Sequence, residues 1–495
     1  MQPLIPCPTT FTTTEDTFPA PQTLRARAPE WTSTVLQALA AAPFFPKVTR
    51  TTDESAEITI MAPESPSLVP SELPDSSYEL EVSGKGITIR CAQPAGLVAA
   101  LRTLHALRTG EGFQGATVTD TPVHRYRGLH LDVCRHFFGV DFLKRTIALA
   151  SALGLNVLHW HLTEDQGWRL PVDSWPGLNE VGAYRTEQDG TRYGGFYTKT
   201  QVQDVVNYAG LHGMLVIPEV ELPGHAQAAI ASYPQLSCQG APVPVRNTWG
   251  ISEEVFCAGN DDVFQFLDDI FAEVVELFPS RYIHIGGDEC PKTRWKSCPK
   301  CQARITEEGL SDEDELQSYF VSRVADALAR RGRTAIGWDE ILEGGLPAGT
   351  MVMSWRGTEG GIRAAGLGHD VIMTPTTHCY FDYRQVDADD EIGFPNAHSG
   401  GPPPVLTLPQ VLTFDPLNGL SDDVAAHVIG GQANVWTEQL DTEAKVEYMI
   451  APRLLAMAEA LWTAPQTRDY PDFRARARQW LERLDEFQWS YGPVP

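Results

Sequence analysis

The sequence predicts an α/β fold, a (β/α)8 barrel preceded by a small α+β domain. Its 495 residues are more than one ordinary compact core holds, and we expect a first domain at 1–122 and the barrel at 123–495. From His124 onward, short apolar runs alternate with amphipathic helical patterns, as in parallel sheets. Eight such units in about 340 residues match the size of a barrel with insertions. A doubly wound open sheet is the structural alternative.

The small domain is predicted from strand-like alternation followed by a helix. Residues 54–62 and 77–92 alternate between apolar and polar side chains, and a Ser-Gly-Lys-Gly turn interrupts the second run. An amphipathic helix follows from Pro94 and ends at Gly110. The first 25 or so residues are rich in Thr and Pro, and we expect them to lie irregularly over the surface.

The barrel elements follow in order along the chain. Strands are predicted at 127–135, 155–162, 214–222, 281–287, 333–338, 350–355, 370–377 and 427–436. Helical patterns cover 141–154, 198–213, 261–278, 314–332 and 359–368. Residues 385–423 are predicted to form a long loop after the seventh strand, and 442–462 the final packing helix. The tail contains one more helical pattern at 472–488.

Composition excludes several classes of partner. The formal net charge of −26 argues against nucleic acid and anionic membranes and favours a neutral ligand. No apolar run approaches the roughly 20 residues that a membrane helix needs. The N-terminus has neither a basic nor an apolar signal region, so we expect a cytoplasmic protein, although a chain whose leader had been removed would look the same.

The motif HIGGDE, residues 284–289, is the most informative stretch of the chain. An apolar run ends in two glycines and the adjacent acids Asp288 and Glu289. Neighbouring side chains on a strand point to opposite faces, so the pair cannot lie wholly in the core or wholly on the surface. Capping of the next helix by these acids is the alternative interpretation.

The other predicted strands also end in polar or aromatic side chains. These are Arg135 and His136; His159, His161, Glu164 and Asp165; Glu219, Glu221 and His225; Trp338, Asp339, Glu340 and Trp355; Tyr380 and Asp382; Trp436 and Glu438. Active sites of barrels form where the carboxyl ends of the strands meet. Carboxylates, tryptophans and an arginine together favour a sugar site, because indoles stack on pyranose rings and charged groups bind hydroxyls.

These motifs carry a resemblance to a known family. HIGGDE, HWHLTEDQGWR, VIPEVELPGHA, LDVCRHF, GWDEIL, SWRG, YFDY and ANVWTE together resemble glycoside hydrolase family 20, the β-N-acetylhexosaminidases. The resemblance covers roughly residues 124–462, and the preceding module is similar to the family's smaller N-terminal domain. It implies retaining exo-hydrolysis of terminal N-acetylhexosamine residues on oligosaccharides or glycoconjugates, with no metal and no cofactor.

The resemblance also implies a mechanism without an enzymic nucleophile, an exception among retaining glycosidases. The substrate's 2-acetamido oxygen attacks the anomeric carbon, and water opens the resulting oxazolinium ion. Glu289 would be the general acid and base, while Asp288 would hold the acetamido N–H and Tyr380 its carbonyl. His225, paired with Glu221, would tune the catalytic glutamate; Glu221 stands where Asp is frequent in the family.

The remaining predicted site residues bind the substrate. The resemblance implies that Trp338, Trp355 and Trp436 wall the acetamide and stack on the sugar ring. Arg135, Glu438 and Asp382 would hold its outer hydroxyls. Glu164, which also stands where Asp is often found, and Asp165 complete the set.

The nine cysteines do not form a disulfide framework, and their odd number leaves at least one thiol free. Cys290, Cys298 and Cys301 have the spacing C-x7-C-x2-C, which raises a structural zinc as an alternative, although no fourth ligand is evident. Cys238 and Cys257 correspond to a bridged pair in the family, and both could equally stay free.

Two rival functions come from other classes. His159 and His161 lie on one face of a strand, as in metal-dependent amidohydrolase barrels, but the fifth and sixth strands end in Trp rather than in a metal ligand. A non-catalytic sugar-binding protein is the other rival, which the intact Asp288, Glu289 and Tyr380 disfavour. GlcNAc or GalNAc preference, the natural glycan and the oligomeric state stay open.

Overall fold

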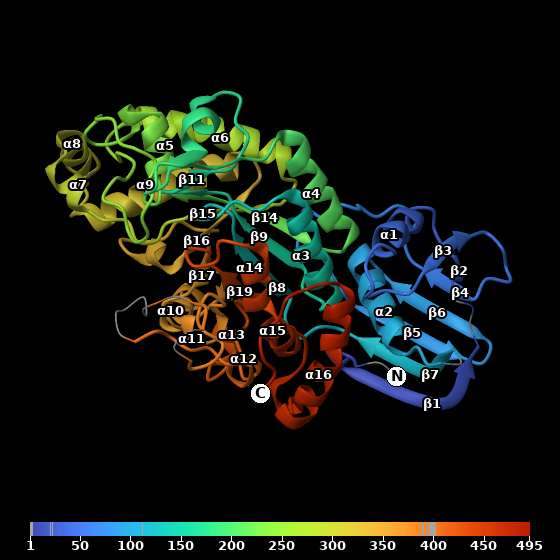
Figure 1. Ribbon diagram of the computed structural model, residues 1–495. Coiled ribbons are helices and arrows are strands. Elements are labelled where there is room, and N and C mark those ends of the chain that lie inside the picture. Colours follow the sequence, from blue (N-terminus) through green and yellow to red (C-terminus); the bar gives the residue numbers. More distant parts are fainter. Residues whose placement is uncertain are drawn as a thin grey trace.

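A computed structural model describes residues 3–19, 21, 23–110, 112–388, 391–393, 395 and 402–495. Figure 1 shows an N-terminal sheet in blue at one end of the molecule and a barrel with its helices at the other. The predicted combination of a small α+β domain and a (β/α)8 barrel is therefore confirmed.

The N-terminal part is a sheet with the strand order β1-β7-β5-β6-β4-β2-β3. Its elements are β1 (Thr10–Phe18), β2 (Leu24–Arg27), α1 (Thr32–Leu39), β3 (Val48–Thr51), β4 (Ile58–Met61), β5 (Tyr78–Ser83), β6 (Gly86–Cys91), α2 (Pro94–Ala106) and β7 (Phe113–Asp120). The predicted strands at 54–62 and 77–92 and the helix from Pro94 are confirmed.

The prediction of an irregular N-terminal segment is wrong for residues 10–18. This segment is the edge strand β1 and pairs antiparallel with β7. Five of its nine residues are Thr in a largely exposed strand, so the hydrophobic alternation that marks a half-buried strand is missing. The β-branched Thr side chains still favour extended backbone, and the sheet supplies the pairing partner.

The barrel closes with eight parallel strands, so the open doubly wound sheet is excluded. The strands are β8 (Tyr126–Asp132), β9 (Val157–His161), β14 (Leu215–Leu222), β15 (Tyr282–Gly286), β16 (Thr334–Trp338), β17 (Met351–Ser354), β18 (Val371–Met373) and β19 (Val428–Val435). Closure comes from the pairing of β19 with β8, where Gly431 faces Arg127 and Val435 faces Leu131. All eight predicted strands lie at these positions.

Helices and short hairpins connect the barrel strands. The helices are α3 (Val140–Ala152), α4 (Lys199–Leu211), α5 (Gln227–Ser232), α6 (Asp261–Leu277), α7 (Thr293–Ser297), α8 (Pro299–Glu308), α9 (Glu313–Arg330), α10 (Glu359–Gly366), α11 (Thr376–Cys379), α12 (Leu408–Leu412) and α13 (Asp422–Ala425). The hairpins are β10 (Thr163–Glu164) with β11 (Gly167–Trp168) and β12 (Tyr184–Thr186) with β13 (Arg192–Gly194). Side-chain caps at Thr198, Asn260 and Asp312 fix the starts of α4, α6 and α9.

The predicted packing helix at 442–462 is two helices rather than one. These are α14 (Glu443–Ile450) and α15 (Arg453–Trp462), and Pro452 lies between them. Proline has no N–H to donate and disfavours helical backbone in the residue before it, so the helix stops there. The predicted loop at 385–423 contains α12 and the start of α13, and its residues 389–390, 394 and 396–401 lie outside the described part of the chain.

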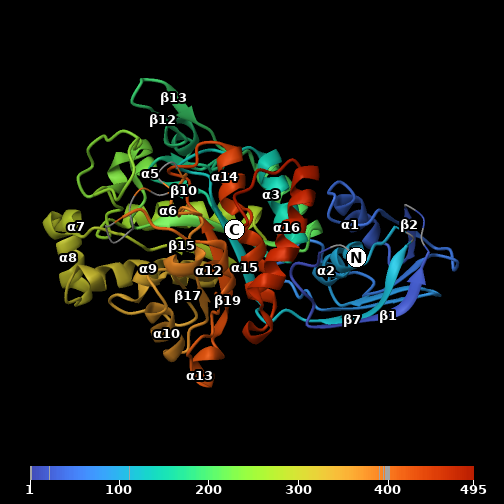
Figure 2. The same cartoon turned by 60° about the horizontal axis from the view of Figure 1, so that its bottom comes forward.

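The C-terminal helix α16 (Tyr470–Glu486) joins the two parts of the molecule. Figures 1 and 2 show it in red on the side of the barrel that faces the blue sheet. Its Trp480 stacks on Phe44 of the N-terminal part, with ring centroids 5.6 Å apart. In the described part of the chain, no helix combines the length and the apolar character needed to cross a membrane.

Candidate active site

A pocket of about 330 Å³ lies where the carboxyl ends of the barrel strands meet. All but two of its lining residues are among the predicted site residues. The lining comprises Arg135, Glu164, His225, Gly250, Ile251, Asp288, Glu289, Trp338, Trp355, Tyr380, Trp436 and Glu438. A cavity that collects acids, aromatic rings and one arginine from so many different strand ends is suited to a polar ring-shaped ligand.

The two adjacent acids owe their position to unusual backbone after β15. Gly286 and Gly287 have φ angles of 65° and 100°, a region that glycine adopts without steric cost. A Cβ at Gly286 would lie 1.7 Å from Oε2 of Glu221, so the strand can end here only with glycine. Glu289 itself has a φ of 43°, which is strained for a non-glycine residue and typical of functional positions.

His225 faces both acids from the end of β14. Its Nε2 lies 3.6 Å from Oδ2 of Asp288 and 3.6 Å from Oε2 of Glu289. Burial alone would lower the pKa of His225, but the carboxylates of Glu164 and Asp288 raise it well above its ordinary value. The backbone of His225 is also left-handed, with a φ of 51°. We infer a protonated imidazole held against the acid pair.

The partner of His225 is Glu164, and the predicted pairing with Glu221 is wrong. Nδ1 of His225 lies 2.8 Å from Oε1 of Glu164, which comes from the hairpin strand β10. The side chain of Glu221 points instead beneath Gly286. Burial, together with the neighbouring carboxylates of Asp288 and Glu219, raises the pKa of Glu221 well above its usual range. Glu221 is therefore packed under the strand end, in surroundings that disfavour its ionised form.

Asp288 and Glu289 have different environments although they are adjacent. The side chain of Asp288 is 12% exposed and that of Glu289 is 29% exposed, so Glu289 is the acid that reaches further into the pocket. Burial raises the pKa of Asp288 to about 6, which His225 opposes and the Glu289 carboxylate assists. Two neighbouring acids in unlike environments can perform separate tasks.

Arg135 is fixed at one side of the pocket by three carboxylates. Its guanidinium nitrogens lie 3.3 Å from Asp132, 3.2 Å from Glu164 and 3.9 Å from Glu438. The guanidinium carbon also lies 5.0 Å from the centroid of a Trp436 ring. Arg135 is thus a fixed cation that, together with the nearby Glu438, is suited to binding hydroxyls.

Aromatic side chains form the wall of the pocket. Trp338 donates its indole N–H to Oε1 of Glu219 at 2.9 Å, and Trp355 donates to Oε2 of Glu340 at 2.9 Å. The rings of Trp355 and Tyr380 stack with their centroids 6.1 Å apart and their planes inclined by 27°. Because the indole N–H groups of Trp338 and Trp355 are hydrogen-bonded to buried carboxylates, the flat apolar faces of the rings remain to line the cavity.

Three predicted site residues do not line the pocket. Glu221 lies beneath β15, as described above. Asp165 accepts the backbone N–H of Gln227 at 2.9 Å, and burial raises its pKa to about 6. Asp382 is buried, and burial with the nearby Glu438 carboxylate raises its pKa well above the usual range. Each of these three acids is buried near a residue that lines the pocket.

Four histidines from three strands surround Glu219 below the pocket. Nδ1 of His161 lies 2.5 Å from Oε2 of Glu219, Nε2 of His159 lies 3.1 Å from the same oxygen, and Nδ1 of His284 lies 2.8 Å from Oε1. His130 completes the group, which is fully buried and separate from the pocket lining. A catalytic zinc needs an open coordination position for substrate, so this sealed cluster does not support the amidohydrolase alternative.

Sequence reasoning missed Gly250 and Ile251, which line the pocket from the connection between β14 and α6. They lie far along the chain from any strand end, so no local pattern distinguishes them from other loop residues. It also missed how Glu219 and Glu340 hold the indoles of Trp338 and Trp355. Glu219 lies in the motif VIPEVELPGHA and Glu340 in GWDEIL, and this placement was the only sign of their role in the sequence.

The cysteine pattern differs from the predicted trio. Cys298 and Cys301 gather with Cys238 and Cys257 rather than with Cys290. Cys238 and Cys257, which correspond to a bridged pair in the family, are both free thiols in this structure. Cys290 is partly exposed and packs against Gly224.

Comparison with known proteins agrees with the geometry. The model described as "Glycosyl hydrolase family 20, catalytic domain" matches residues 124–465, and the model of its domain 2 matches residues 1–121. A β-hexosaminidase of Porphyromonas gingivalis is 45% identical over 86% of this chain and 55% of its own length. One of Akkermansia muciniphila is 34% identical over 82% of this chain and 83% of its own. The chain thus spans only about half the length of the first of these relatives.

Solved structures show the same architecture. The GH20 exo β-N-acetylglucosaminidase of Vibrio harveyi in complex with N-acetylglucosamine has a TM-score of 0.87 and 31% identity, covering 100% of this chain and 78% of that one. A Streptomyces plicatus N-acetyl-β-hexosaminidase has a TM-score of 0.85 and 28% identity, covering 99% and 96%. With both family domains matched in order and a relative of this identity, the chain belongs to glycosyl hydrolase family 20.

Proposed function

We propose that this chain is a retaining exo-β-N-acetylhexosaminidase that hydrolyses terminal non-reducing N-acetylhexosamine residues through an oxazolinium intermediate. The observation that carries the proposal is the pair Asp288 and Glu289 beside His225, at the edge of a pocket walled by tryptophans. Relatives named β-hexosaminidase and a structural neighbour in complex with N-acetylglucosamine support the same substrate class.

Glu289 is the general acid in this proposal. It is the more exposed of the two acids, so it can meet the glycosidic oxygen, donate its proton and later accept one from water. The imidazolium of His225, 3.6 Å away, stabilises the carboxylate that Glu289 becomes after this transfer. The cation is itself held in place by Glu164.

The nucleophile comes from the substrate, because the other pocket carboxylates are already engaged. Glu164 contacts Arg135, His161 and His225, and Glu438 faces Arg135. Asp288 and Glu289 both approach the same imidazole nitrogen, so they act from one side of the pocket instead of flanking the scissile bond. Asp288 then binds the acetamido N–H and stabilises the positive charge of the oxazolinium.

Recognition of the sugar follows from the remaining wall. Tyr380 donates a hydrogen bond to the acetamido carbonyl and orients it for attack. Such orientation accelerates intramolecular reactions, with effective molarities of about 10⁵ M or more. Trp338, Trp355 and Trp436 enclose the acetamide and stack on the ring. Arg135 and Glu438 bind the outer hydroxyls of the terminal sugar.

The central test replaces the proposed acid. Glu289→Gln keeps the size of the side chain and removes its proton transfer, so we expect kcat for a nitrophenyl N-acetylglucosaminide to fall by about 10²–10⁴-fold. Glu482→Gln, an exposed position on α16, is the matched control and keeps full activity. Undiminished turnover by a folded Glu289→Gln protein would refute the assignment.

A second test addresses the nucleophile. A 2-hydroxy glucoside lacks the acetamide, so we expect it to be cleaved poorly, and a thiazoline that mimics the oxazolinium should inhibit competitively. Equal kcat/KM for the glucoside and the N-acetylglucosaminide would exclude substrate assistance. Binding of N-acetylglucosamine without turnover of any glycoside would instead indicate a non-catalytic sugar-binding protein.

A further inference from the structure

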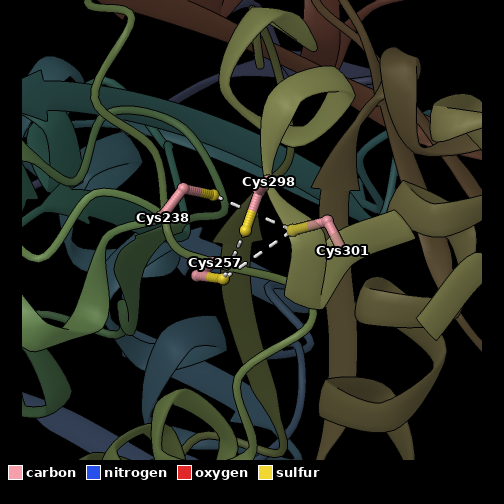
Figure 3. Close-up of side chains that lie close together, drawn as sticks. All are labelled: Cys238, Cys257, Cys298 and Cys301. Carbon is pink, nitrogen blue, oxygen red and sulfur yellow. Dashed lines mark hydrogen bonds between the residues drawn. The ribbon is translucent and has the colours of Figure 1, made fainter. Parts of the chain in front are cut away.

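Four cysteine thiols from two distant segments meet beside the barrel. Figure 3 shows the sulfurs of Cys238, Cys257, Cys298 and Cys301 pointing toward one another. The Sγ atom of Cys257 lies 3.7 Å from those of Cys298 and Cys301, and Cys238 lies 3.8 Å from Cys301. All four sulfurs lie within 4.8 Å of one another, and all four residues are free cysteines.

These separations are those of a metal site. In a disulfide the sulfurs are about 2.05 Å apart. Tetrahedral zinc binds thiolate sulfur at about 2.3 Å, a geometry whose sulfur–sulfur edges measure about 3.8 Å. The three sulfur–sulfur distances therefore match the edges of a zinc tetrathiolate. We propose that Cys238, Cys257, Cys298 and Cys301 bind one structural zinc ion.

The backbone around the thiols has the form that such sites require. Cys298 and Cys301 form a C-P-K-C turn, in which Cys298 precedes α8 and Cys301 lies in its first turn. A two-residue spacing is typical of zinc-binding cysteine pairs. Cys238 and Cys257 come from the other segment, where the neighbouring residues Ser237 and Phe256 pair as a β-bridge. Each segment thus supplies two ligands from a fixed position.

Close packing holds the two segments together. A Cβ at Gly259 would lie 2.2 Å from the carbonyl carbon of Lys300, so the backbones approach as closely as glycine allows. Trp295 donates its indole N–H to the carbonyl of Phe256 at 2.9 Å. Cys257, Cys298 and Cys301 are buried, which shields the proposed metal from water.

The proposed zinc is structural and not catalytic. None of its four ligands lines the pocket, and four thiolates leave no coordination position for a substrate. The ion would tie the segment from Cys238 to Cys257, which carries Gly250 and Ile251 into the pocket wall, to the helices that follow Glu289. It would therefore support the pocket wall and stabilise the fold whether or not the proposed activity is correct.

The direct test is metal content. Untagged protein, purified with reductant and without chelator, should contain about one zinc per chain by inductively coupled plasma mass spectrometry. Cys298→Ser should reduce the zinc content at least tenfold, while Cys290→Ser, a nearby cysteine outside the cluster, should retain it. Iron in place of zinc, metal-free wild-type protein, or equal zinc loss in the two variants would overturn the proposal.

Two further measurements hold even if Cys298→Ser fails to fold. Denatured wild-type protein that has not been reduced should take up nine alkyl groups, since every cysteine would be a thiol or thiolate. Loss of two or four alkyl groups would indicate one or two disulfides, including the Cys238–Cys257 bridge of the family, and would refute a tetrathiolate. Cobalt exchanged for zinc should give the strong visible absorption of tetrahedral thiolate cobalt, and its absence would also contradict the site.

Discussion

Two clusters of histidines and carboxylates lie in this barrel, and they differ in what surrounds them. In the lower cluster, Glu219 is enclosed by His130, His159, His161 and His284, all fully buried. In the upper cluster, His225 joins Glu164 to Asp288 and Glu289 at the pocket. Residue type alone would make both look catalytic, whereas exposure to the pocket separates them.

Backbone strain and charge separate the two clusters as well. His225 and Glu289 have left-handed backbone in the upper cluster, with φ angles of 51° and 43°. In the lower cluster, burial opposes but the Glu219 carboxylate raises the pKa of His161 to about 10, while burial lowers that of His159 to about 3. The lower cluster is therefore a sealed ion pair of His161 with Glu219 that supports the fold, and the upper one is strained and open.

Breaking the lower cluster should have the largest effect, and it should act on stability. We expect Glu219→Ala to reduce the free energy of unfolding by about 3–5 kcal/mol, because it removes one partner of a buried ion pair and leaves His161 with only the more distant Glu164 carboxylate. Urea unfolding followed by tryptophan fluorescence measures this change. Glu482→Ala on the exposed face of α16 is the control and should stay within about 0.5 kcal/mol of wild type. A loss below about 1 kcal/mol in Glu219→Ala would mean that the cluster is not a stabilising ion pair.

Breaking the upper cluster should act on catalysis instead. We expect Asp288→Asn to lower kcat/KM by about 10²–10³-fold, as when one transition-state hydrogen-bonding group is removed. Stability should not fall, because the raised pKa of Asp288 means that its ionised form is unfavourable in the folded protein. Steady-state kinetics and urea unfolding of the same samples measure both, with the exposed Asp326→Asn as control. A stability loss matching that of Glu219→Ala would erase the distinction between the clusters.

Glu164 links the clusters, since its carboxylate contacts His225 at 2.8 Å and His161 at 3.3 Å. We expect Glu164→Gln to lower kcat/KM by about 10–100-fold, corresponding to a charged hydrogen bond of about 1.5–3 kcal/mol. The limb of the pH profile that reports His225 should also move to lower pH, because the carboxylate that raises its pKa is gone. An unchanged pH profile would make Glu164 a structural residue only.

The smallest effect is the acid limb of wild-type activity. In the proposed mechanism Asp288 must be ionised to stabilise the oxazolinium, and its pKa is raised to about 6. The ionised fraction falls as pH drops through that value, so kcat/KM at pH 5 should be about tenfold below its plateau. Rates measured after return to pH 7 check that the loss is reversible. A flat profile down to pH 5 would show that no group with this pKa controls the reaction.

The barrel and most of its site could be predicted because both depend on local sequence. Each strand is a short apolar run, and the ends of parallel strands meet at one face, so residues such as Arg135, Asp288 and Trp436 converge without knowledge of any contact. Edge strand β1 was missed because its side chains are mostly exposed. Its formation depends on pairing with β7, about one hundred residues away in the chain.

Contacts between side chains of different strands could not be predicted. Glu164 follows strand β9 and Glu221 lies near the end of β14, so the sequence does not show which carboxylate contacts the imidazole of His225. In the structure the hairpin β10–β11 places Glu164 beside it. The same holds for the cysteines. The C-x7-C-x2-C spacing suggested Cys290, Cys298 and Cys301, but Cys290 lies outside the cluster. The two cysteines that join Cys298 and Cys301 instead lie 41 and 63 residues from their sulfur contacts.

The connection that carries Gly250 and Ile251 has its two ends side by side, where Ser237 pairs with Phe256. A loop closed at its base can change in length and composition at little cost to the structure that holds it. Changes in this loop can therefore alter the rim of the pocket without moving the acids proposed to transfer protons. For engineering, a library confined to residues 243–254 would vary the rim of the pocket and leave Asp288 and Glu289 untouched.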